Sequence, residues 1–236
     1  MNATEAFLVE VMDVIAERFD KHAVLRGGMV LRVLGCERFT NDVDYVFVPF
    51  ASKKDIVDEV LAALRRIEGA QVSHSINSKC LRISLSRKDV AVQVEIKTAK
   101  EIKTSLVSNR DLARSYGWPP RIIPVLDYAV ALADKMAAWN ERRLIRDLYD
   151  ICFYLRMGIR PDEKTLWQRL VRPAYSKRVK MGDHFTGKSV EEFYVFLRKF
   201  AQALTDASIR AELSDYLPDD DMVGLAMRFR AELAAL

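Results

Sequence analysis

The stretch LRGGMVLRVLGCERFTNDVDYVF, residues 25–47, combines a glycine pair, a short helical pattern and the start of a strand. A short apolar run, 23–25, precedes Gly27 and Gly28, and apolar residues at helical spacing follow them. The run 43–50 is rich in β-branched and aromatic residues, which predicts a strand. The order of strand, glycine turn, helix and strand predicts an α/β unit in the N-terminal half of the chain.

Two aspartates, Asp42 and Asp44, stand at the start of the second predicted strand. Side chains at i and i+2 of a strand point to the same face, whereas Val43 and Tyr45 point to the other. Two carboxylates on one face can share a hard cation such as Mg²⁺, which prefers oxygen ligands. An Asp-x-Asp pair can also be a solvated turn that caps the strand, so the pattern alone leaves both interpretations open.

The glycine pair favours the metal-site interpretation over the capping turn. Because Gly27 and Gly28 lack side chains, the backbone there can approach a ligand closely. The N–H groups at the start of the following helix favour phosphate. The pair can equally be an ordinary tight turn. Together with Asp42 and Asp44, however, it predicts a site in which the backbone holds a triphosphate and the carboxylates hold a bridging metal.

A third carboxylate stands within the predicted strand 90–97. Apolar and polar residues alternate along VAVQVEIK, so one face is apolar and the other carries Glu95. If this strand lies beside strand 43–50, Glu95 can face Asp42 and Asp44. Three carboxylates around one or two Mg²⁺ ions suit phosphoryl and nucleotidyl transfer, because the metals stabilise the attacking and leaving oxygens. Glu95 can also belong to the solvated face of an antiparallel sheet.

The remaining pattern predicts two domains. In the N-terminal half, helices are predicted at 4–19 and 53–67, and strands at 71–76, 80–86 and 90–97. Beyond Trp118-Pro119-Pro120, the predicted elements are helices at 125–140, 144–157, 162–171, 189–204, 206–215 and 220–235. We therefore predict the α+β class, with a domain at 1–115 that contains four or five strands and a helical domain at 116–236.

Composition excludes several classes of protein. The chain has 236 residues, of which 50% are hydrophobic and 30% are charged, and its net charge is +4. This is typical of a globular domain and permits a polyanionic partner. The three cysteines are far apart in apolar stretches, so we expect reduced core residues of a cytoplasmic protein. The acidic N-terminal stretch argues against a signal peptide, and no apolar run approaches the ~20 residues of a membrane-spanning helix.

The C-terminal half contains charged residues among apolar ones. Lys135 sits among apolar neighbours, from which its ammonium group can extend to water. Arg143 and Asp147 are spaced i,i+4 on the next predicted helix, and Asp147 and Asp150 are spaced i,i+3. An exposed ladder of charges has the same spacing, so the pattern alone assigns these residues no function.

A basic segment spans residues 169–188. Its basic residues are Arg169, Arg172, Lys177, Arg178, Lys180 and Lys188, and Tyr175, His184 and Phe185 lie among them. Basic side chains can contact phosphates and aromatic rings can stack on bases, as expected of a nucleic-acid surface. A solvated loop can have the same composition.

Two signatures in these stretches resemble those of known families. LRGGMVLRVLG followed by FTNDVDYVF, with VEIK further on, resembles the signature of DNA polymerase β-type nucleotidyltransferases. DKMAAWNERRLIRDLYDICFYL (134–155) resembles the second signature of the AbiEii/AbiGii-type toxin nucleotidyltransferases. The resemblance covers residues 22–157. It implies an N-terminal polymerase β-like domain, with a mixed sheet flanked by helices, and a helical domain that completes the active-site cleft.

The resemblance also implies roles for individual residues. The implied catalytic residues are Asp42, Asp44, Glu95 and Asp147, of which the first three would hold Mg²⁺ or Mn²⁺. The implied nucleotide-binding residues are Gly27, Gly28, Lys135 and Arg146, with Lys135 reaching the triphosphate of the NTP. Arg146 and Asp150 can also brace the helix packing. The sequence departs from the family pattern at Met29, where the family more often has a small or hydroxylated residue.

The expected function is transfer of a nucleoside monophosphate from an NTP to an acceptor. The resemblance implies that the acceptor is RNA, at the 3′ end of a tRNA, and that the protein is the toxin of a bacterial toxin–antitoxin or abortive-infection system with a cognate antitoxin. The expected RNA-binding residues are Arg172, Lys177, Arg178 and Lys180. One alternative is a small-molecule nucleotidyltransferase of the antibiotic-modifying kind, and another is a non-catalytic relative that binds nucleotide or RNA.

Overall fold

A computed structural model describes residues 2–173 and 185–236 of the chain. The chain divides into two compact units, Met1–Asp127 and Tyr128–Leu236. The boundary predicted between 115 and 116 lies inside the first unit, because Ile122–Leu126 forms a strand of its sheet (β7). Lys177, Arg178 and Lys180 lie outside the described residues.

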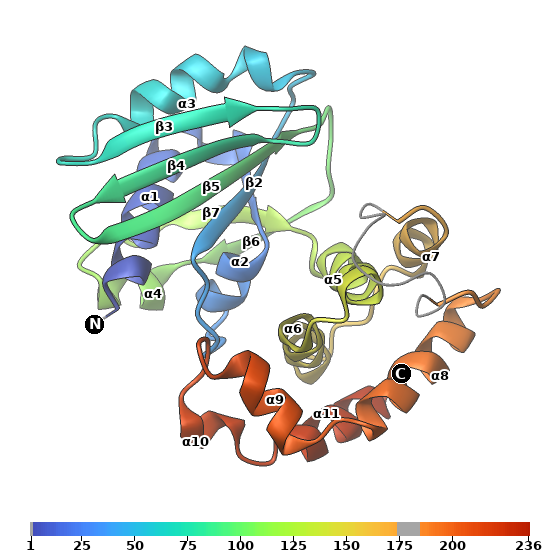
Figure 1. Ribbon diagram of the computed structural model, residues 1–236. Helices are drawn as coiled ribbons and strands as arrows, with labels where there is room; N and C mark the ends of the chain where they lie inside the picture. Colours follow the sequence, from blue (N-terminus) through green and yellow to red (C-terminus); the bar gives the residue numbers. More distant parts are fainter. Residues whose placement is uncertain (1, 174–184) are drawn as a thin grey trace. The chain divides into compact units, whose positions relative to one another are not determined.

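The first unit is built on a seven-stranded mixed sheet of order β3-β4-β5-β2-β1-β7-β6 (Figure 1). Its strands are β1 (Ala23–Arg26), β2 (Asp42–Phe47), β3 (Gln71–Ile76), β4 (Leu81–Arg87), β5 (Val90–Thr98), β6 (Thr104–Ser108) and β7. β2 pairs with β5 and β1 with β7 in parallel, and the other neighbours are antiparallel. The mixed sheet confirms the predicted fold class, although the sheet has two more strands at one edge than expected.

Helices cover one face of the central strands. The helical elements of this unit are α1 (Ala3–Phe19), η1 (Asp20–His22), α2 (Gly28–Val33), η2 (Lys53–Asp55), α3 (Val57–Leu64) and α4 (Arg110–Ser115). In Figure 1, α1 lies behind β4 and β5, and its long apolar side chains are buried. Side chains of β4 and β5 alternate accordingly, with Leu81, Ile83, Leu85, Val92, Val94 and Ile96 buried.

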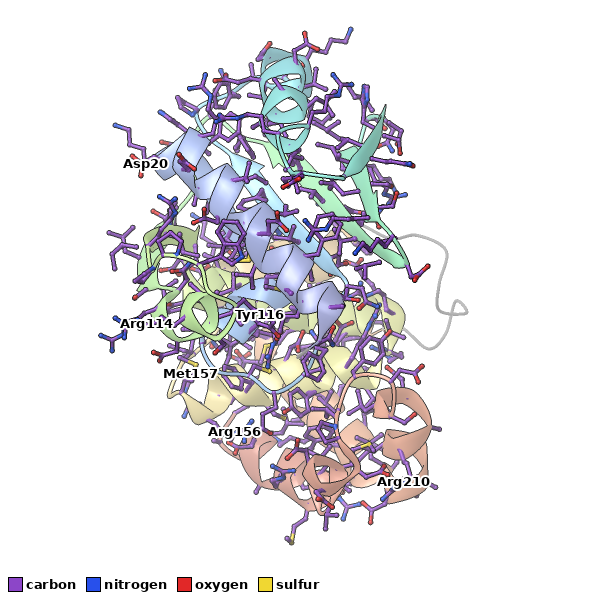
Figure 2. All side chains as sticks on the ribbon, turned by 90° about the vertical axis from the view of Figure 1, so that its left-hand side faces the viewer. Asp20, Arg114, Tyr116, Arg156, Met157 and Arg210 are labelled. Atoms are coloured by element: carbon purple, nitrogen blue, oxygen red, sulfur yellow. The ribbon has the colours of Figure 1, made fainter. Side chains whose placement is uncertain are left out.

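A buried glutamate ties α2 to α1. Glu5 of α1 forms an ion pair with Arg32 of α2, whose Nη2 donates to Glu5 Oε2 at 3.0 Å. The hydroxyl of Tyr116, labelled beside α1 in Figure 2, also donates to Glu5 Oε2 at 2.5 Å. Burial and the interaction with Glu5 raise the pKa of Tyr116 to about 12. This network fixes the helix that follows the glycine pair.

The second unit is helical where the structure describes it, as predicted. Its helices are α5 (Tyr128–Arg142), α6 (Ile145–Arg156), α7 (Glu163–Val171), α8 (Val190–Gln202), α9 (Asp206–Leu213), α10 (Asp219–Met222) and α11 (Leu225–Leu233). The helix predicted at 220–235 is two helices, because Gly224 adopts a left-handed φ of 70° between them. Trp139 is fully buried among Phe193, Phe196 and Phe200.

Composition led us to expect reduced core cysteines and no apolar run of the length of a membrane-spanning helix. Cys36, Cys80 and Cys152, all in the described part of the chain, are buried and form no disulfide. Within residues 2–173 and 185–236, no helix is long and apolar enough to cross a membrane.

Candidate active site

Strand β2 presents Asp42 and Asp44 on one face of the sheet. Val43 and Tyr45 point to the other face and are buried, and burial raises the pKa of the Tyr45 hydroxyl well above its usual range. Asp42 is exposed and Asp44 is half-buried. The alternation predicted from the i,i+2 spacing is therefore present, and both carboxylates lie on the face that carries the polar side chains of β5.

Gly27 brings the backbone directly against Asp44. It follows β1 with φ 76° and ψ −151°, a conformation that L-residues rarely adopt. A Cβ atom built at Gly27 would overlap the Asp44 carboxylate, and it would lie 3.1 Å from Asp44 Cγ. The space that a side chain would fill is thus occupied by one of the two candidate catalytic carboxylates.

Thr40 connects the glycine pair to the other carboxylate. Its Oγ1 donates to Asp42 Oδ1 at 2.6 Å. A Cβ atom at Gly28 would lie 3.0 Å from Thr40 Cβ and Oγ1. Met29, the position that departs from the family pattern, is fully buried, so its side chain contributes to the core.

We expect Gly27→Ala to destabilise the first unit by about 1–3 kcal/mol, the cost of a sparsely populated backbone conformation. It should also lower any activity of the carboxylates, because the new methyl group displaces Asp44. Gly117→Ala is the matched control, since Gly117 has φ 77° but a Cβ there meets nothing within 4 Å. Urea unfolding gives both free energies of unfolding, and an equal loss of activity in the two variants would contradict the role of the Asp44 contact.

Glu95 lies beside Asp44, as expected if strand 90–97 is the neighbour of strand 43–50, but its carboxylate is already paired with an arginine. β2 and β5 are adjacent, and Asp44 and Glu95 are paired positions. Arg82 of β4 donates to Glu95 Oε1 from Nη2 at 2.7 Å and from Nε at 3.1 Å. The hydrogen bond to Glu95, with its charge, raises the pKa of Arg82. Across the described residues, no three or more His, Cys, Asp or Glu side chains form a group that could hold a metal ion.

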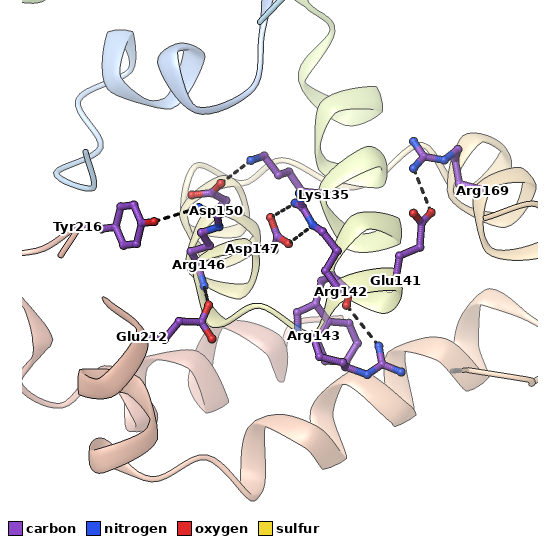
Figure 3. Close-up of polar contacts among 11 residues, drawn as sticks. Lys135, Glu141, Arg142, Arg143, Arg146, Asp147, Asp150, Arg169, Glu212 and Tyr216 are labelled. Carbon is purple, nitrogen blue, oxygen red and sulfur yellow. Dashed lines mark hydrogen bonds and ion pairs between the residues drawn. The ribbon is translucent and has the colours of Figure 1, made fainter. Parts of the chain in front are cut away.

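Lys135 and Asp150 form an ion pair between α5 and α6 (Figure 3). Lys135 Nζ lies 2.5 Å from Asp150 Oδ2, and the Asp150 side chain is only 1% exposed. The ammonium group is therefore held by a buried carboxylate, which differs from a lysine that simply extends to water. Asp150 braces the helix packing, as the resemblance allowed.

Asp147 is held by Arg142 rather than Arg143. Arg142 donates to both Asp147 oxygens, from Nη2 to Oδ1 at 2.5 Å and from Nε to Oδ2 at 3.0 Å (Figure 3). The i,i+4 geometry expected for Arg143 and Asp147 is wrong, because Arg143 has φ 56° and precedes the first residue of α6. Arg143 instead stacks on Trp139, with its guanidinium carbon 4.4 Å from the ring centroid.

Arg146 makes its contacts with α9 and the residues after it. Its backbone N–H donates to Glu212 Oε1 at 3.2 Å, and its Nη1 donates to the Tyr216 hydroxyl at 3.2 Å. These contacts fit the bracing role that was considered for Arg146. Its nucleotide-binding role remains a prediction.

The basic segment is only partly described. Arg172 is exposed at the end of α7, whereas Arg169 is paired with Asp134 and Glu141. Phe185 packs on Phe193 and Phe196, with ring centroids 5.4 and 5.8 Å apart. Arg169 and Phe185 therefore serve the packing of the second unit, and the remaining predicted RNA contacts, other than Arg172, lie outside the described residues.

Comparison with solved structures identifies the class of fold. JHP933 from Helicobacter pylori is similar with a TM-score of 0.58 and 12% identity, over 100% of this chain and 92% of that chain. MenT4, a nucleotidyltransferase toxin from Mycobacterium tuberculosis H37Rv, is similar with a TM-score of 0.50 and 18% identity, over 98% and 95% of the two chains. At these identities the likeness shows that the chain shares the fold of these two proteins, and nothing more. No curated protein sequence matches the chain.

The family follows from the sequence itself. Residues 11–233 match the model of the family described as nucleotidyl transferase AbiEii toxin, type IV toxin–antitoxin system. The match covers most of both units, so the chain belongs to the AbiEii family of nucleotidyltransferase toxins. The resemblance drawn from the glycine pair, the Asp-x-Asp pair and residues 134–155 is thereby confirmed.

Proposed function

We propose that the protein transfers a nucleoside monophosphate from an NTP to RNA, at the 3′ end of a tRNA, in a reaction that requires Mg²⁺ or Mn²⁺. A hydroxyl oxygen of the acceptor forms a bond to the α-phosphorus of the NTP and gives up its proton to solvent. The bond between the α-phosphorus and the α–β bridging oxygen breaks, and pyrophosphate leaves with that oxygen. Membership of the nucleotidyltransferase family supports the reaction class. The RNA acceptor is inferred from the family resemblance and from the basic segment 169–188, and the metal from the carboxylate pair Asp42 and Asp44.

The observation that carries the proposal is the contact between Gly27 and Asp44. Because Gly27 has no side chain, its backbone lies directly against the Asp44 carboxylate, so the same short segment can offer backbone N–H groups to phosphates and a carboxylate to the metal that they bind. Asp42 stands two residues away on the same face, and Thr40 orients it. A solvated turn that merely caps the strand would need neither the Gly27 conformation nor the contact with Asp44.

The donor set suits Mg²⁺. This ion is usually bound by one or two carboxylates together with substrate phosphates and water, so Asp42 and Asp44 are sufficient protein ligands. Glu95 can join them if its bond with Arg82 opens. The metal, when bound, would neutralise charge on the phosphates. In this proposal, Gly27 and Gly28 hold the phosphates through their backbone.

The second unit would contribute Lys135 to the phosphates of the NTP and Asp147 near the nucleotide or acceptor. Asp150 keeps Lys135 in one position, which lowers the entropy that the lysine loses on binding. The Asp147 carboxylate is likewise held in an ion pair, with Arg142. We therefore propose that Asp147 contributes less to the reaction than Asp42 or Asp44.

The family description names a type IV toxin–antitoxin system, and we therefore propose that a cognate antitoxin opposes this protein in a bacterial cytoplasm. A small-molecule acceptor is the second candidate. An antibiotic-type acceptor is cationic and calls for an acidic pocket, which the basic residues of segment 169–188 do not favour. A non-catalytic role would not require Asp42, Asp44, Glu95, Lys135 and Asp147 to be present together.

The direct test is incubation with each labelled NTP in turn, Mg²⁺ and total tRNA. We expect label from one NTP or a subset of them to enter RNA and to be lost when EDTA is added. Label that appears only in small molecules would favour the second candidate. No transfer from any NTP to any acceptor would contradict the proposed activity.

A second test concerns Lys135. We expect Lys135→Ala to raise the KM for NTP roughly 10- to 100-fold, since a charge-assisted contact contributes about 1.5–3 kcal/mol. That change also leaves Asp150 buried without its partner. The control is Lys135→Met/Asp150→Leu, in which apolar side chains replace the pair and the fold should be retained. If the double variant uses NTP with the wild-type KM, Lys135 has only a structural role.

A further inference from the structure

The first unit has a polar sheet surface that its helices leave uncovered. Its exposed or half-buried side chains come from β3, β4 and β5. We name this surface the open face and define it by Ser73, Ser75, Arg82, Ser84, Gln93 and Glu95. In Figures 1 and 2, α1 lies on the opposite side of these strands, and none of the helices described between residues 2 and 127 covers the open face.

The strand register joins the open face to the candidate catalytic carboxylates. One row of paired positions runs from Ser75 through Arg82 and Glu95 to Asp44. The next row runs from Ser73 through Ser84 and Gln93 to Asp42. Neighbouring strands lie about 4.8 Å apart, so each row extends roughly 14 Å from β2 to β3. A ligand that lies along these rows reaches the two aspartates at one end.

The chemistry of the open face suits a sugar–phosphate chain. Serine hydroxyls, a glutamine amide and an arginine guanidinium are donors that proteins use on phosphate and ribose oxygens. The six side chains include no aromatic ring on which a base could stack. They also include no large apolar side chain, although such groups form the centre of most protein–protein interfaces. The surface therefore matches a nucleic-acid backbone better than a protein partner.

The charged side chains of the open face also leave donors for phosphate. Arg82 and Glu95 form an ion pair, in which the two charges cancel. The Arg82 side chain is still 47% exposed, so it can contact a second oxygen. Lys97, two residues beyond Glu95 on the same face of β5, is also exposed. A phosphate on the open face could thus accept hydrogen bonds from Arg82 and Lys97.

We propose that the open face binds the ribose–phosphate backbone of the single-stranded nucleotides that precede the acceptor 3′ end. This inference rests on the proposed transfer to RNA. Arg82 contacts a backbone phosphate, and the serines and Gln93 bind phosphate and ribose oxygens. Because these contacts involve the backbone, the open face accepts different base sequences, and recognition of a particular acceptor comes from other parts of the protein.

The experiment uses the full-length protein and two short single-stranded RNAs of unrelated sequence. Ser84→Asp places a negative charge on the open face, and Arg82→Gln removes a positive one. The matched controls are His74→Asp and Arg66→Gln, at exposed positions on the other face of β3 and after α3. Binding is followed by fluorescence anisotropy at several salt concentrations, and the KM for NTP is measured separately.

We expect both open-face variants to bind both RNAs about tenfold more weakly, because Arg82→Gln removes one charge-assisted contact and Ser84→Asp adds a negative charge that repels phosphate. For Arg82→Gln, the dependence of log Kd on log salt should fall by about 0.7, the value for one phosphate on a single strand. The controls should bind like the wild type, and Ser84→Asp should retain the KM for NTP.

The outcomes separate this inference from the proposed function. If the wild type labels RNA and the open-face variants bind it normally, the inference is wrong and the proposed function stands. Equal weakening in the controls also overturns the inference, because it indicates a general charge effect. If the wild type neither binds nor labels RNA, the proposed transfer to RNA itself fails.

Discussion

Replacing Asp44 by asparagine is expected to lower nucleotidyl transfer by a factor on the order of 10³, with little change in folding. The substitution keeps the shape of the side chain and removes the charge that a metal requires. Charge stabilisation by a bound metal contributes several kcal/mol to the transition state, and each 1.36 kcal/mol is a factor of ten in rate. Asp42→Asn should have the same kind of effect, although Asp42 is more exposed.

The control for this prediction is Asp89→Asn in the turn between β4 and β5. Asp89 is exposed and lies outside the candidate site, so its loss should leave the transfer rate unchanged. Rates are measured with saturating NTP and Mg²⁺, and thermal unfolding confirms the fold. Wild-type rates for both Asp42→Asn and Asp44→Asn would remove these residues from the catalytic assignment.

Arg142→Ala is expected to destabilise the second unit by about 3–5 kcal/mol. The Asp147 side chain is 2% exposed, so the substitution leaves a buried carboxylate without its guanidinium partner. The matched control is Arg210→Ala. Arg210 and its partner Asp219 are both exposed, and such pairs contribute less than about 1 kcal/mol. Urea unfolding measures both changes, and similar small losses would contradict the structural role of the Arg142–Asp147 pair.

Asp147→Asn then distinguishes a chemical role from a structural one. If Asp147 acts on the nucleotide or acceptor, the transfer rate of the folded fraction falls. If it serves only to bind Arg142, stability falls and the transfer rate of the folded fraction is retained. The proposed role of Asp147 near the nucleotide or acceptor predicts the first result, and the second would leave Asp147 with only its bidentate contact with Arg142.

The candidate site in the first unit could be predicted because it depends on local geometry. Alternation along a strand places Asp42 and Asp44 on one face whatever the rest of the sheet does. The glycine pair has a similarly local signature. The position of Glu95 depended on which strands are neighbours, so the sequence allowed it only conditionally, and the register of β2 and β5 then paired it with Asp44.

The partners of the charged residues could not be predicted, because they depend on single-residue shifts. A turn one residue earlier, at 86–89, would pair Arg82 with Gln93, but the pairing of Arg87 with Val90 places Arg82 opposite Glu95. In the same way, the left-handed conformation of Arg143 ends α5 and turns Arg142 toward Asp147. Neither shift leaves a signal in hydrophobic periodicity.

Strand β7, one of the two additional strands, was missed for a different reason. The sequence of β7, IIPVL, contains Pro124, and proline is rare inside a sheet because it has no N–H to donate. Its apolar run also continues into α5, so periodicity extended the helix back to residue 125. The parallel pairing of β7 with β1 is a long-range contact that composition does not reveal.

The packing of Trp139 has a spectroscopic consequence. Of the three tryptophans, only Trp139 is fully buried, whereas Trp118 of the first unit and Trp167 of α7 are half-buried. The ring of Trp139 lies against three phenylalanines and under the Arg143 guanidinium. Its emission should therefore lie at shorter wavelength than that of the other two and shift to longer wavelength when the second unit unfolds. The fluorescence of Trp139 thus reports the unfolding of the second unit without an attached dye.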